Sequence, residues 1–288
     1  MSDQASDDDA VLQSWQVRAE AYDGLVRRWP EFRAMAGRLV TLVLEHDPGA
    51  LDGPVVDLAG GSGLVGEALV AAGARELVLV EPAPRMCELA AARLGSTLRS
   101  VVMARAEDCV GRPGLPEGLN ASAVLCSAAF HLMDEARVLS EVARVLRPGG
   151  VFATNLWGHS FDETAGLETD PETSTESSGP DWRALLEPEL ARRGAELPET
   201  RGEPPRLRTR AGLARAATRA GLELVDLRLD EDDSCAAMIL DFLAMSPRFL
   251  GFLAPEVRAE VLIAALRRGR ERQPSRSVRL AFRRPAGL

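Results

Sequence analysis

Lysine is absent from this chain of 288 residues, which has only one tyrosine and 5% aromatic residues. The formal net charge is −9, which argues against a nucleic-acid partner because phosphate binding needs a basic patch. No apolar run reaches the ~18 residues that a membrane span requires. The first nine residues are acidic and lack an apolar core, unlike a signal peptide. These absences predict a cytoplasmic protein that binds neither nucleic acid nor membrane.

Cysteine is scarce and carries no recognisable pattern. No pair among the four cysteines is spaced C-x-x-C, so neither a zinc site nor a redox motif is indicated. We therefore expect no metal site and four buried free thiols: Cys87, Cys109, Cys126 and Cys235.

The rest of the composition is that of an ordinary globular protein. Hydrophobic residues make up 46% of the chain and charged residues 27%, which is enough apolar material for a full core. The length allows one or two domains, and we favour one α/β domain with insertions.

A glycine-rich turn between a strand and a helix is the central feature of the sequence. An apolar strand that contains Asp57 runs into Gly60, Gly61 and Gly63, and a helical pattern follows. Such a turn points backbone N–H groups and the positive end of a helix at one spot, which suits an anionic ligand group. Glycine is favoured there because a side chain would block close approach and disfavour positive φ.

Two interpretations of this turn compete. Gly61-x-Gly63-x-x-Gly66 matches the dinucleotide fingerprint. Asp57 favours a different ligand, one that carries an ammonium group as well as a carboxylate, because an acid there would repel a pyrophosphate. Glu81, at the end of the next strand, can accept both hydroxyls of a ribose in either interpretation.

Strands and helices alternate over the first half of the chain, which predicts a parallel sheet with right-handed crossovers. Strands are expected at 54–58, 76–80, 98–103, 121–126 and 151–156, and helices at 64–72, 84–94 and 133–146. The tight turn Arg147-Pro148-Gly149-Gly150 should precede the fifth strand. Further on we expect a helix at 208–220, strands at 222–229 and 277–282, and helices at 181–193, 236–245 and 255–268.

The segments outside this alternation are more varied. Residues 1–9 are expected to be disordered, and 10–45 to form one or two helices broken near Trp29-Pro30. Residues 158–206 interrupt the pattern with a polar stretch at 169–180, and could form a lid or a plain surface loop.

The chain resembles the class I S-adenosylmethionine (SAM)-dependent methyltransferases. The resemblance rests on four stretches in order: Val55-Val56-Asp57-Leu58-Ala59-Gly60-Gly61-Ser62-Gly63, Val80-Glu81-Pro82-Ala83-Pro84-Arg85-Met86, Arg105-Ala106-Glu107-Asp108 and Arg144-Val145-Leu146-Arg147-Pro148-Gly149-Gly150. Ala59 departs from the family, which usually has its first glycine there.

The resemblance implies the fold and the domains. The expected fold is a Rossmann-like α/β domain with a seven-stranded, mostly parallel sheet and helices on both faces. Its last strand would be antiparallel and inserted between the fifth and sixth positions. Residues 1–45 would form a helical lid, and 46–288 the SAM-binding domain with an insertion at 158–206 and a helical cap at 236–271.

The resemblance also implies the cofactor site. Tyr22 would either reach the cofactor's carboxylate or simply pack, and the backbone of Cys126 would face the methionyl part. Adenine would contact Ala106 and either Glu107 or Asp108. Because the family often has an acid at the position of Arg105, the resemblance does not decide which of these two acids would bind the adenine. The expected cofactor residues are Tyr22, Asp57, Ala59, Gly60, Gly61, Gly63, Glu81, Pro82, Met86, Ala106, Glu107, Asp108 and Cys126.

Methyl transfer from a sulfonium is an in-line displacement that mainly needs positioning and desolvation, and no metal. His131 and His159 follow strands on the ligand side and are the candidate general bases, although His131 could be structural. Trp15, Phe130, Trp157 and the 242–252 segment suggest a small, partly apolar acceptor. Substrate and methylated atom stay open, and so does the oligomeric state.

We therefore expect a small-molecule methyltransferase, of secondary metabolism, that converts SAM to S-adenosylhomocysteine. Three alternatives remain. One is other SAM chemistry, such as cyclisation or aminocarboxypropyl transfer of the cofactor. Another is a NAD-dependent oxidoreductase, which Asp57 and the turn at 147–150 disfavour. The last is a non-catalytic, cofactor-binding regulator.

Overall fold

The computed structural model describes residues 2–157, 161, 182–197, 208–245, 250, 252–268 and 272–287. The chain divides into two compact units. The first comprises Met1–Leu156, Thr209–Arg228 and Val278–Leu288, and the second comprises Trp157–Arg208 and Leu229–Ser277.

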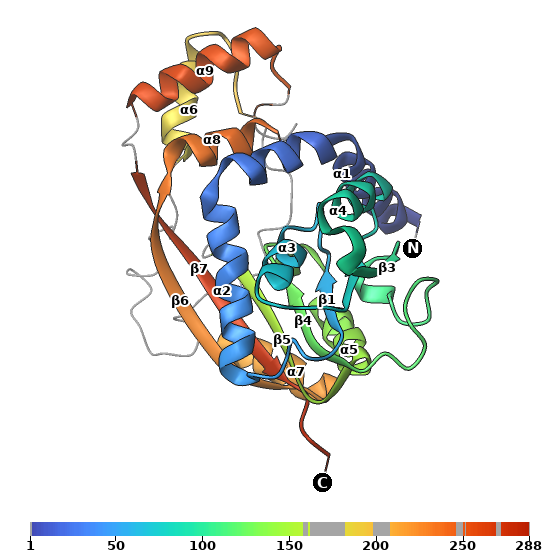
Figure 1. Cartoon of the computed structure of the whole chain (residues 1–288). Coiled ribbons are helices and arrows are strands. Elements are labelled where there is room, and N and C mark those ends of the chain that lie inside the picture. Colours follow the sequence, from blue (N-terminus) through green and yellow to red (C-terminus); the bar gives the residue numbers. More distant parts are fainter. Residues whose placement is uncertain are drawn as a thin grey trace. The chain divides into compact units, whose positions relative to one another are not determined.

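The sheet has seven strands in the order β3-β2-β1-β4-β5-β7-β6 (Figure 1). The neighbours from β3 to β5 pair in parallel, and β7 lies between β5 and β6 in one antiparallel hairpin. This confirms the predicted Rossmann-like sheet and the position of its last strand. The strands are β1 Val55–Leu58, β2 Leu77–Val80, β3 Leu98–Val102, β4 Ala121–Cys126, β5 Leu146–Trp157, β6 Glu223–Cys235 and β7 Arg272–Arg283.

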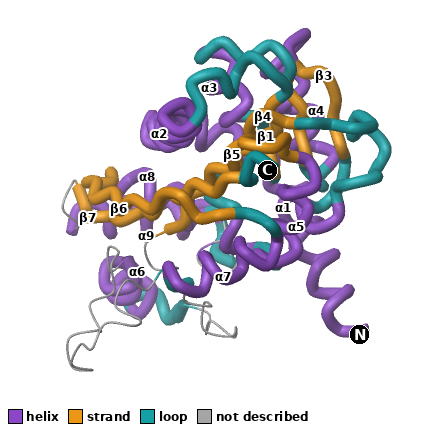
Figure 2. The backbone as a smooth tube through the Cα atoms, turned by 90° about the horizontal axis from the view of Figure 1, so that it is seen from below, coloured by secondary structure: helices purple, strands orange, loops and turns teal. Residues whose placement is uncertain are grey.

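Helices of the first unit cover both faces of the sheet: α2 and α3 lie on one face, and α5 and α7 on the other (Figure 2). These helices are α1 Ser2–Arg28, α2 Pro30–His46, α3 Leu64–Ala71, α4 Pro84–Leu94, α5 Glu135–Val145 and α7 Arg210–Ala220. Three short 3₁₀ helices join them: η1 Gly95–Thr97, η2 Ala106–Asp108 and η3 Phe130–Leu132.

Local sequence signals explain where these helices begin and end. Pro30 and Pro84 occupy the first positions of α2 and α4, where proline's missing N–H costs nothing. The carboxylate of Asp134 accepts a hydrogen bond from the Arg137 N–H and caps α5. Helices α4 and α7 end at Gly95 and Gly221, which have φ of 56° and 80°.

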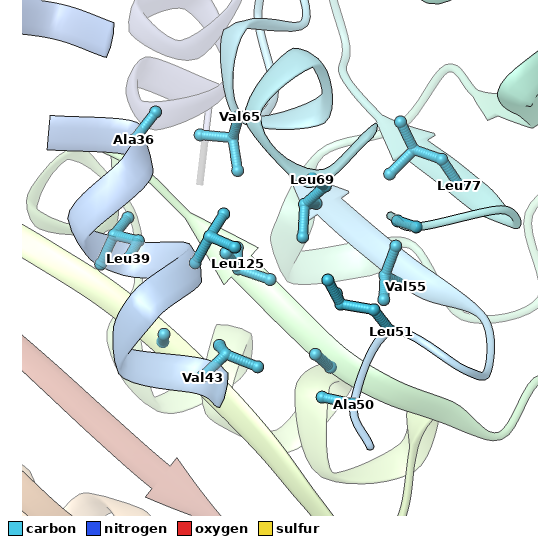
Figure 3. Close-up of a cluster of buried hydrophobic side chains, with 14 of the residues drawn as sticks. Ala36, Leu39, Val43, Ala50, Leu51, Val55, Val65, Leu69, Leu77 and Leu125 are labelled. Atoms are coloured by element: carbon cyan, nitrogen blue, oxygen red, sulfur yellow. The ribbon is translucent and has the colours of Figure 1, made fainter. Parts of the chain in front are cut away.

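An apolar layer joins α2 and α3 to one face of the sheet (Figure 3). Leu39 and Val43 of α2 and Leu69 of α3 lie against Val55 and Leu125 of the strands, and all five are buried. Burial of each such side chain contributes about 1.5–3 kcal/mol. This layer fixes the helix that follows the glycine turn onto the sheet.

Two segments differ from the sequence predictions. Residues 2–9, expected to be disordered, are the start of α1, where several aspartates favour the positive N-terminal end of a helix. The turn at 147–150 lies inside β5 as an irregularity of the strand, since Ala121 pairs with Leu146 and Ala123 with Val151. Gly149 donates to the Arg284 carbonyl and Arg284 to the Gly150 carbonyl, so the end of the chain completes this segment.

The second unit contains α6 Trp182–Ala191, α8 Ala236–Ala244 and α9 Pro255–Arg268. Its described apolar cluster consists of Leu186, Leu190, Leu240, Leu243, Leu250, Val261 and Ala265. The polar stretch 169–180 lies outside the described residues. None of the helices in the described part of the chain is both long and apolar enough to span a membrane.

Candidate functional site

The glycine turn after β1 has the conformation that its residues allow. Gly61 and Gly63 have φ of 53° and 83°, in the left-handed region that favours glycine. Gly60 is needed for space, because a Cβ there would lie 2.6 Å from Cγ of Asp57. Ala59 also has a positive φ, 52°, which explains why a glycine at this position is common in the family that the sequence resembles.

Asp57 is fully buried at the end of β1. Its Oδ2 accepts a hydrogen bond from the Gly66 N–H at 2.8 Å, whereas Oδ1 has no partner among the described residues. Burial, followed by the nearby charge of Glu81, raises the pKa of Asp57 to about 7. A buried carboxylate oxygen without a partner is costly, and it commonly marks a site that a ligand completes.

Glu81, at the end of β2, is tied to the same turn. Its Oε2 accepts from the Gly61 N–H and its Oε1 from the Ala83 N–H, each at 3.0 Å. Burial raises the pKa of this carboxyl. Each carboxylate oxygen can accept a further hydrogen bond, so Glu81 can hold the turn and still receive two hydroxyls.

Tyr22 of α1 covers the turn from the other side. Its Cε1 lies 3.7 Å from the ideal Cβ position at Gly61, and its ring meets Trp15 edge-on with centroids 5.5 Å apart. Burial, with Glu81 and Asp57 adding to it, raises the pKa of Tyr22 to about 12. The phenol therefore stays protonated at neutral pH and can donate a hydrogen bond.

Tyr22, Asp57 and the glycine turn border a pocket with about 450 Å³ of empty space, part of it open to solvent, and Glu81 is not among the lining residues. Five of the predicted cofactor residues line it, from Tyr22 through Asp57 to the turn. The full lining is Tyr22, Phe32, Met35, Asp57, Ala59, Gly60, Gly61, Ser62, Leu64, Val65, Ser127 and Ala128. Phe32 and Met35 could not be recognised as lining residues from the sequence, because a helical apolar pattern does not show which of its members face a pocket rather than the core.

The end of β4 contributes a second strained backbone position. Ala128 has φ of 53°, and its N–H donates to Oδ1 of the buried Asn155 at 2.8 Å. The Cys126 carbonyl accepts from Oγ1 of Thr154 at 2.8 Å, and burial raises the pKa of the Cys126 thiol to about 12. Two side chains of β5 therefore fix the backbone of β4 beside the pocket, and the Cys126 thiol stays neutral.

Other expected cofactor residues are not among the lining residues of this pocket. Ala106, Glu107 and Asp108 form η2, where Oε1 of Glu107 accepts from the Asp134 N–H at 3.2 Å and Asp108 pairs with Arg112. Met86 is buried in a cluster between α1 and α4 that also contains Ala19 and Ala83, while Pro82 and Gly63 flank the site in the chain.

The candidate bases and apolar residues have mixed positions. His131 is half-buried in η3 and outside the pocket lining, and His159 lies outside the described residues. Phe130, expected near the pocket mouth, instead packs in the core, where its ring centroid lies 5.7 Å from that of Phe152. Cys87, Cys109 and Cys126 are buried and free, as expected, and the side chain of Cys235 is not described.

Comparisons with known proteins match part of the chain to methyltransferases. Residues 55–150 match the model of a family described as a methyltransferase domain. An uncharacterized methyltransferase from Mycobacterium tuberculosis and one from Mycobacterium bovis are each 36% identical over 126 residues, which cover 41% of this chain. The match covers 48% of each relative, so the chain spans about half the length of the curated relatives that it matches.

Solved structures share the fold at low identity. A candidate sarcosine dimethylglycine methyltransferase from Galdieria sulphuraria has a TM-score of 0.52 at 17% identity, covering 88% of this chain and 86% of that one. A candidate methyltransferase from Bacillus halodurans has a TM-score of 0.52 at 18% identity, with 88% and 99% covered. The cyclase SpnF has a TM-score of 0.50 at 15% identity, with 87% and 82% covered.

The family match favours SAM over a dinucleotide as the ligand of the glycine turn, since it spans β1, the turn and the end of β2. The sheet order and the acid at the end of β1 agree with it. These findings support a class I SAM-dependent methyltransferase with S-adenosylmethionine as its cofactor.

Proposed function

We propose that this protein transfers a methyl group from SAM to a small-molecule acceptor, in the cytoplasm and as part of secondary metabolism. The observation that carries the proposal is the free Oδ1 of Asp57, which is buried beside the glycine turn in a pocket bordered by Tyr22. SAM presents an ammonium and a carboxylate together, and this pocket offers an acid and a phenol for them.

The residues present fit SAM as follows. Oδ1 of Asp57 would receive the ammonium, Tyr22 would donate to the carboxylate, and Glu81 would accept the ribose hydroxyls. Ala106 with Glu107 or Asp108 would hold the adenine, although both carboxylates already have partners within the protein. When bound, SAM supplies an activated methyl sulfonium, so the protein's task is to orient the acceptor and exclude water.

The described lining of the pocket favours an uncharged, partly apolar acceptor. Phe32 and Met35 supply an apolar wall from α2, and Ser127 adds a hydroxyl at the end of β4. No arginine is among these lining residues, so a phosphate or carboxylate on the acceptor would lack a counter-charge there. His131 and His159 remain the candidate bases for an acceptor that must lose a proton.

The same fold supports non-methylating chemistry as a second candidate. The [4+2]-cyclase SpnF shares the fold, which shows that the fold also occurs in enzymes named for reactions other than methyl transfer, and no histidine is among the described lining residues of the pocket. A pocket lined in this way could support a reaction that needs no general base. Cyclisation or aminocarboxypropyl transfer of SAM would proceed at the same Asp57 and Glu81, so the reaction products must distinguish the two.

The decisive experiment is calorimetric titration with SAM, S-adenosylhomocysteine and NAD, followed by product analysis with a panel of small acceptors. We expect binding of the first two ligands, no binding of NAD, and release of S-adenosylhomocysteine. Methylthioadenosine as the product would establish the second candidate instead. Asp57→Ala serves as the matched control and should weaken SAM binding by at least ~1 kcal/mol, the scale of a lost charge-assisted bond.

A further inference from the structure

A buried ion pair joins the N-terminal helix to the core of the first unit. Nη2 of Arg93 on α4 donates to Oδ1 of Asp23 on α1, and the two side chains are only 5% and 10% exposed. Nη1 of Arg93 also donates to Oε2 of Glu67 on α3 at 3.3 Å. Nε of Arg27 donates to the second oxygen of Asp23 at 2.6 Å. One guanidinium therefore links α1, α3 and α4.

Stability alone is a weak explanation for this pair. Desolvation of a buried ion pair offsets much of its attraction, and apolar residues of similar volume often serve as well. Nε of Arg93 is buried without a hydrogen-bond partner in the described part of the chain, which adds a further cost. A buried ion pair with such costs is better explained by a role in fixing how α1 lies against α3 and α4.

Helix α4 packs directly under the glycine turn. An ideal Cβ at Gly63 would lie 3.1 Å from Cβ of Ala90, and one at Gly66 would lie 2.9 Å from Cδ1 of Leu94. Arg93 lies between these two contact residues in sequence. Burial has the larger effect on both pKa values, and the charge of Arg93 lowers those of Tyr22 and Asp57.

Asp23 and Tyr22 are neighbours on α1, and their side chains face different partners. Successive side chains of an α-helix diverge by about 100°, so fixing one of them sets the rotation of the helix about its axis. Asp23 is held by Arg93, while the Tyr22 ring lies over Gly61. A shift of Asp23 would therefore move the tyrosine away from the turn.

We infer that the Asp23–Arg93 pair is a positioning device, which holds Tyr22 over the glycine turn and thereby sets the affinity for SAM. The inference rests on the proposed binding of SAM at this turn. Neither Asp23 nor Arg93 lines the pocket. Asp23 also interacts with Ser62 of the glycine turn, so a comparison with a Tyr22 variant is needed to show that the pair acts through the tyrosine.

Other contacts between α1 and α4 provide a matched comparison (Figure 1). Oε1 of Gln16 accepts from the Arg85 N–H at 2.9 Å, and Nε of Arg85 donates to Oε1 of Glu20 at 2.5 Å. The Arg85–Glu20 pair is exposed, and exposed pairs contribute little. Arg85→Gln therefore weakens a contact between the same two helices without touching the buried pair.

The test is a double-mutant cycle on the dissociation constant for SAM, measured by calorimetry. We expect Tyr22→Phe and Asp23→Asn each to weaken binding about tenfold, because both remove the tyrosine's contribution. The double variant should also be about tenfold weaker, rather than the hundredfold expected for independent effects. Arg93→Gln should match Asp23→Asn, and Arg85→Gln and the exposed Arg99→Gln should bind as the parent does.

The thermal unfolding midpoint of each ligand-free variant reports on folding. If Arg93→Gln does not fold, Asp23→Asn carries the test, since it removes the charge and keeps the side-chain volume. A hundredfold loss in the double variant, or parental affinity in Asp23→Asn, would overturn the positioning role. Failure of the parent protein to bind SAM would instead refute the proposed function on which the inference rests.

Discussion

At the scale of single residues, the site depends on groups held in unfavourable states. Asp57 is buried with one free oxygen, and Ala59 and Ala128 have positive φ without being glycines. Such costs are tolerated where the surrounding structure fixes them, and they concentrate at functional sites. Two predictions follow from the chemistry of these residues.

The affinity for SAM should depend on pH through Asp57. The pKa of this carboxyl is about 7, so in the free protein it is neutral below that pH and charged above it. Only the carboxylate attracts an ammonium, so affinity should rise as the pH increases from 6 to 8, and binding near pH 7 should release a proton. Calorimetry in buffers of different ionisation enthalpy would measure that proton. The Asp57→Asn variant should bind SAM weakly, and its affinity should not change with pH through this residue. If the affinity of that variant rose as steeply with pH as that of the parent, the released proton would come from another group.

Ala59→Gly should stabilise the ligand-free protein slightly. The left-handed conformation costs a non-glycine residue about 1–2 kcal/mol, while the flexibility of glycine in the unfolded chain offsets about 0.4–1 kcal/mol. We expect a net gain of about 0.5 kcal/mol in the free energy of unfolding, measured by chemical denaturation. Ala92→Gly, on the exposed side of α4, is the matched control and should lose about 1 kcal/mol. Equal losses in both variants would show that Ala59 is not strained.

At the scale of elements, the N-terminal helices lie outside the family match, as do the residues after 150. The match begins at residue 55, whereas Tyr22 of α1 and Phe32 and Met35 of α2 line the pocket. Helix α1 rests on α4 through Trp15, Ala19 and Met86. The segment that matches the family thus supplies the turn, and the N-terminal helices complete the pocket.

Deleting residues 1–28 should abolish SAM binding more than it disrupts the sheet. The deletion removes Tyr22 and Asp23, but leaves the apolar layer between α2, α3 and the strands intact. We expect at least a tenfold loss of affinity, with far-ultraviolet circular dichroism that still shows a folded α/β domain. Deletion of residues 1–9 alone is the control, since Trp15 and Tyr22 remain. Parental affinity in the longer deletion would rule out a role for α1 in the site.

Local signals explain how much of these elements could be predicted from sequence. Helix α4 was predictable because Pro84 starts it and Gly95 ends it, and β4 because five of its six residues are apolar, Ser122 being the exception. The irregular start of β5 was not, because its turn residues bond to Arg284, which no local pattern indicates. Asp57, the glycine turn and Glu81 form a contiguous motif, whereas Phe32, Asn155 and the Asp23–Arg93 pair depend on tertiary contacts.

At the scale of the whole molecule, the described site belongs to one unit. All the lining residues lie in the first unit, at the point where the strand order reverses between β1 and β4. Open α/β sheets bind ligands at such a point, beyond the carboxyl ends of the strands.

Hydrogen exchange should therefore reveal a localised response to SAM. At 100 times its dissociation constant, a ligand stabilises the binding-competent state by about 2.7 kcal/mol. We expect slower exchange at residues 16–28, 55–66 and 81–87, and unchanged exchange in α6 and α9. S-adenosylhomocysteine should produce the same pattern in a parallel experiment. If SAM instead slowed exchange most strongly in the helices of the second unit, the SAM site would not lie at the glycine turn.

The tyrosine beside the glycine turn is also the chain's sole tyrosine, and it meets the indole of Trp15 edge-on at 5.5 Å. The protein thus contains a built-in optical reporter at the site itself. Phenol absorbance arises from Tyr22 alone, and fluorotyrosine incorporated during expression would give one fluorine resonance without any substitution. Ligand binding and movement of the N-terminal helix can therefore both be followed through Tyr22 without changing the sequence.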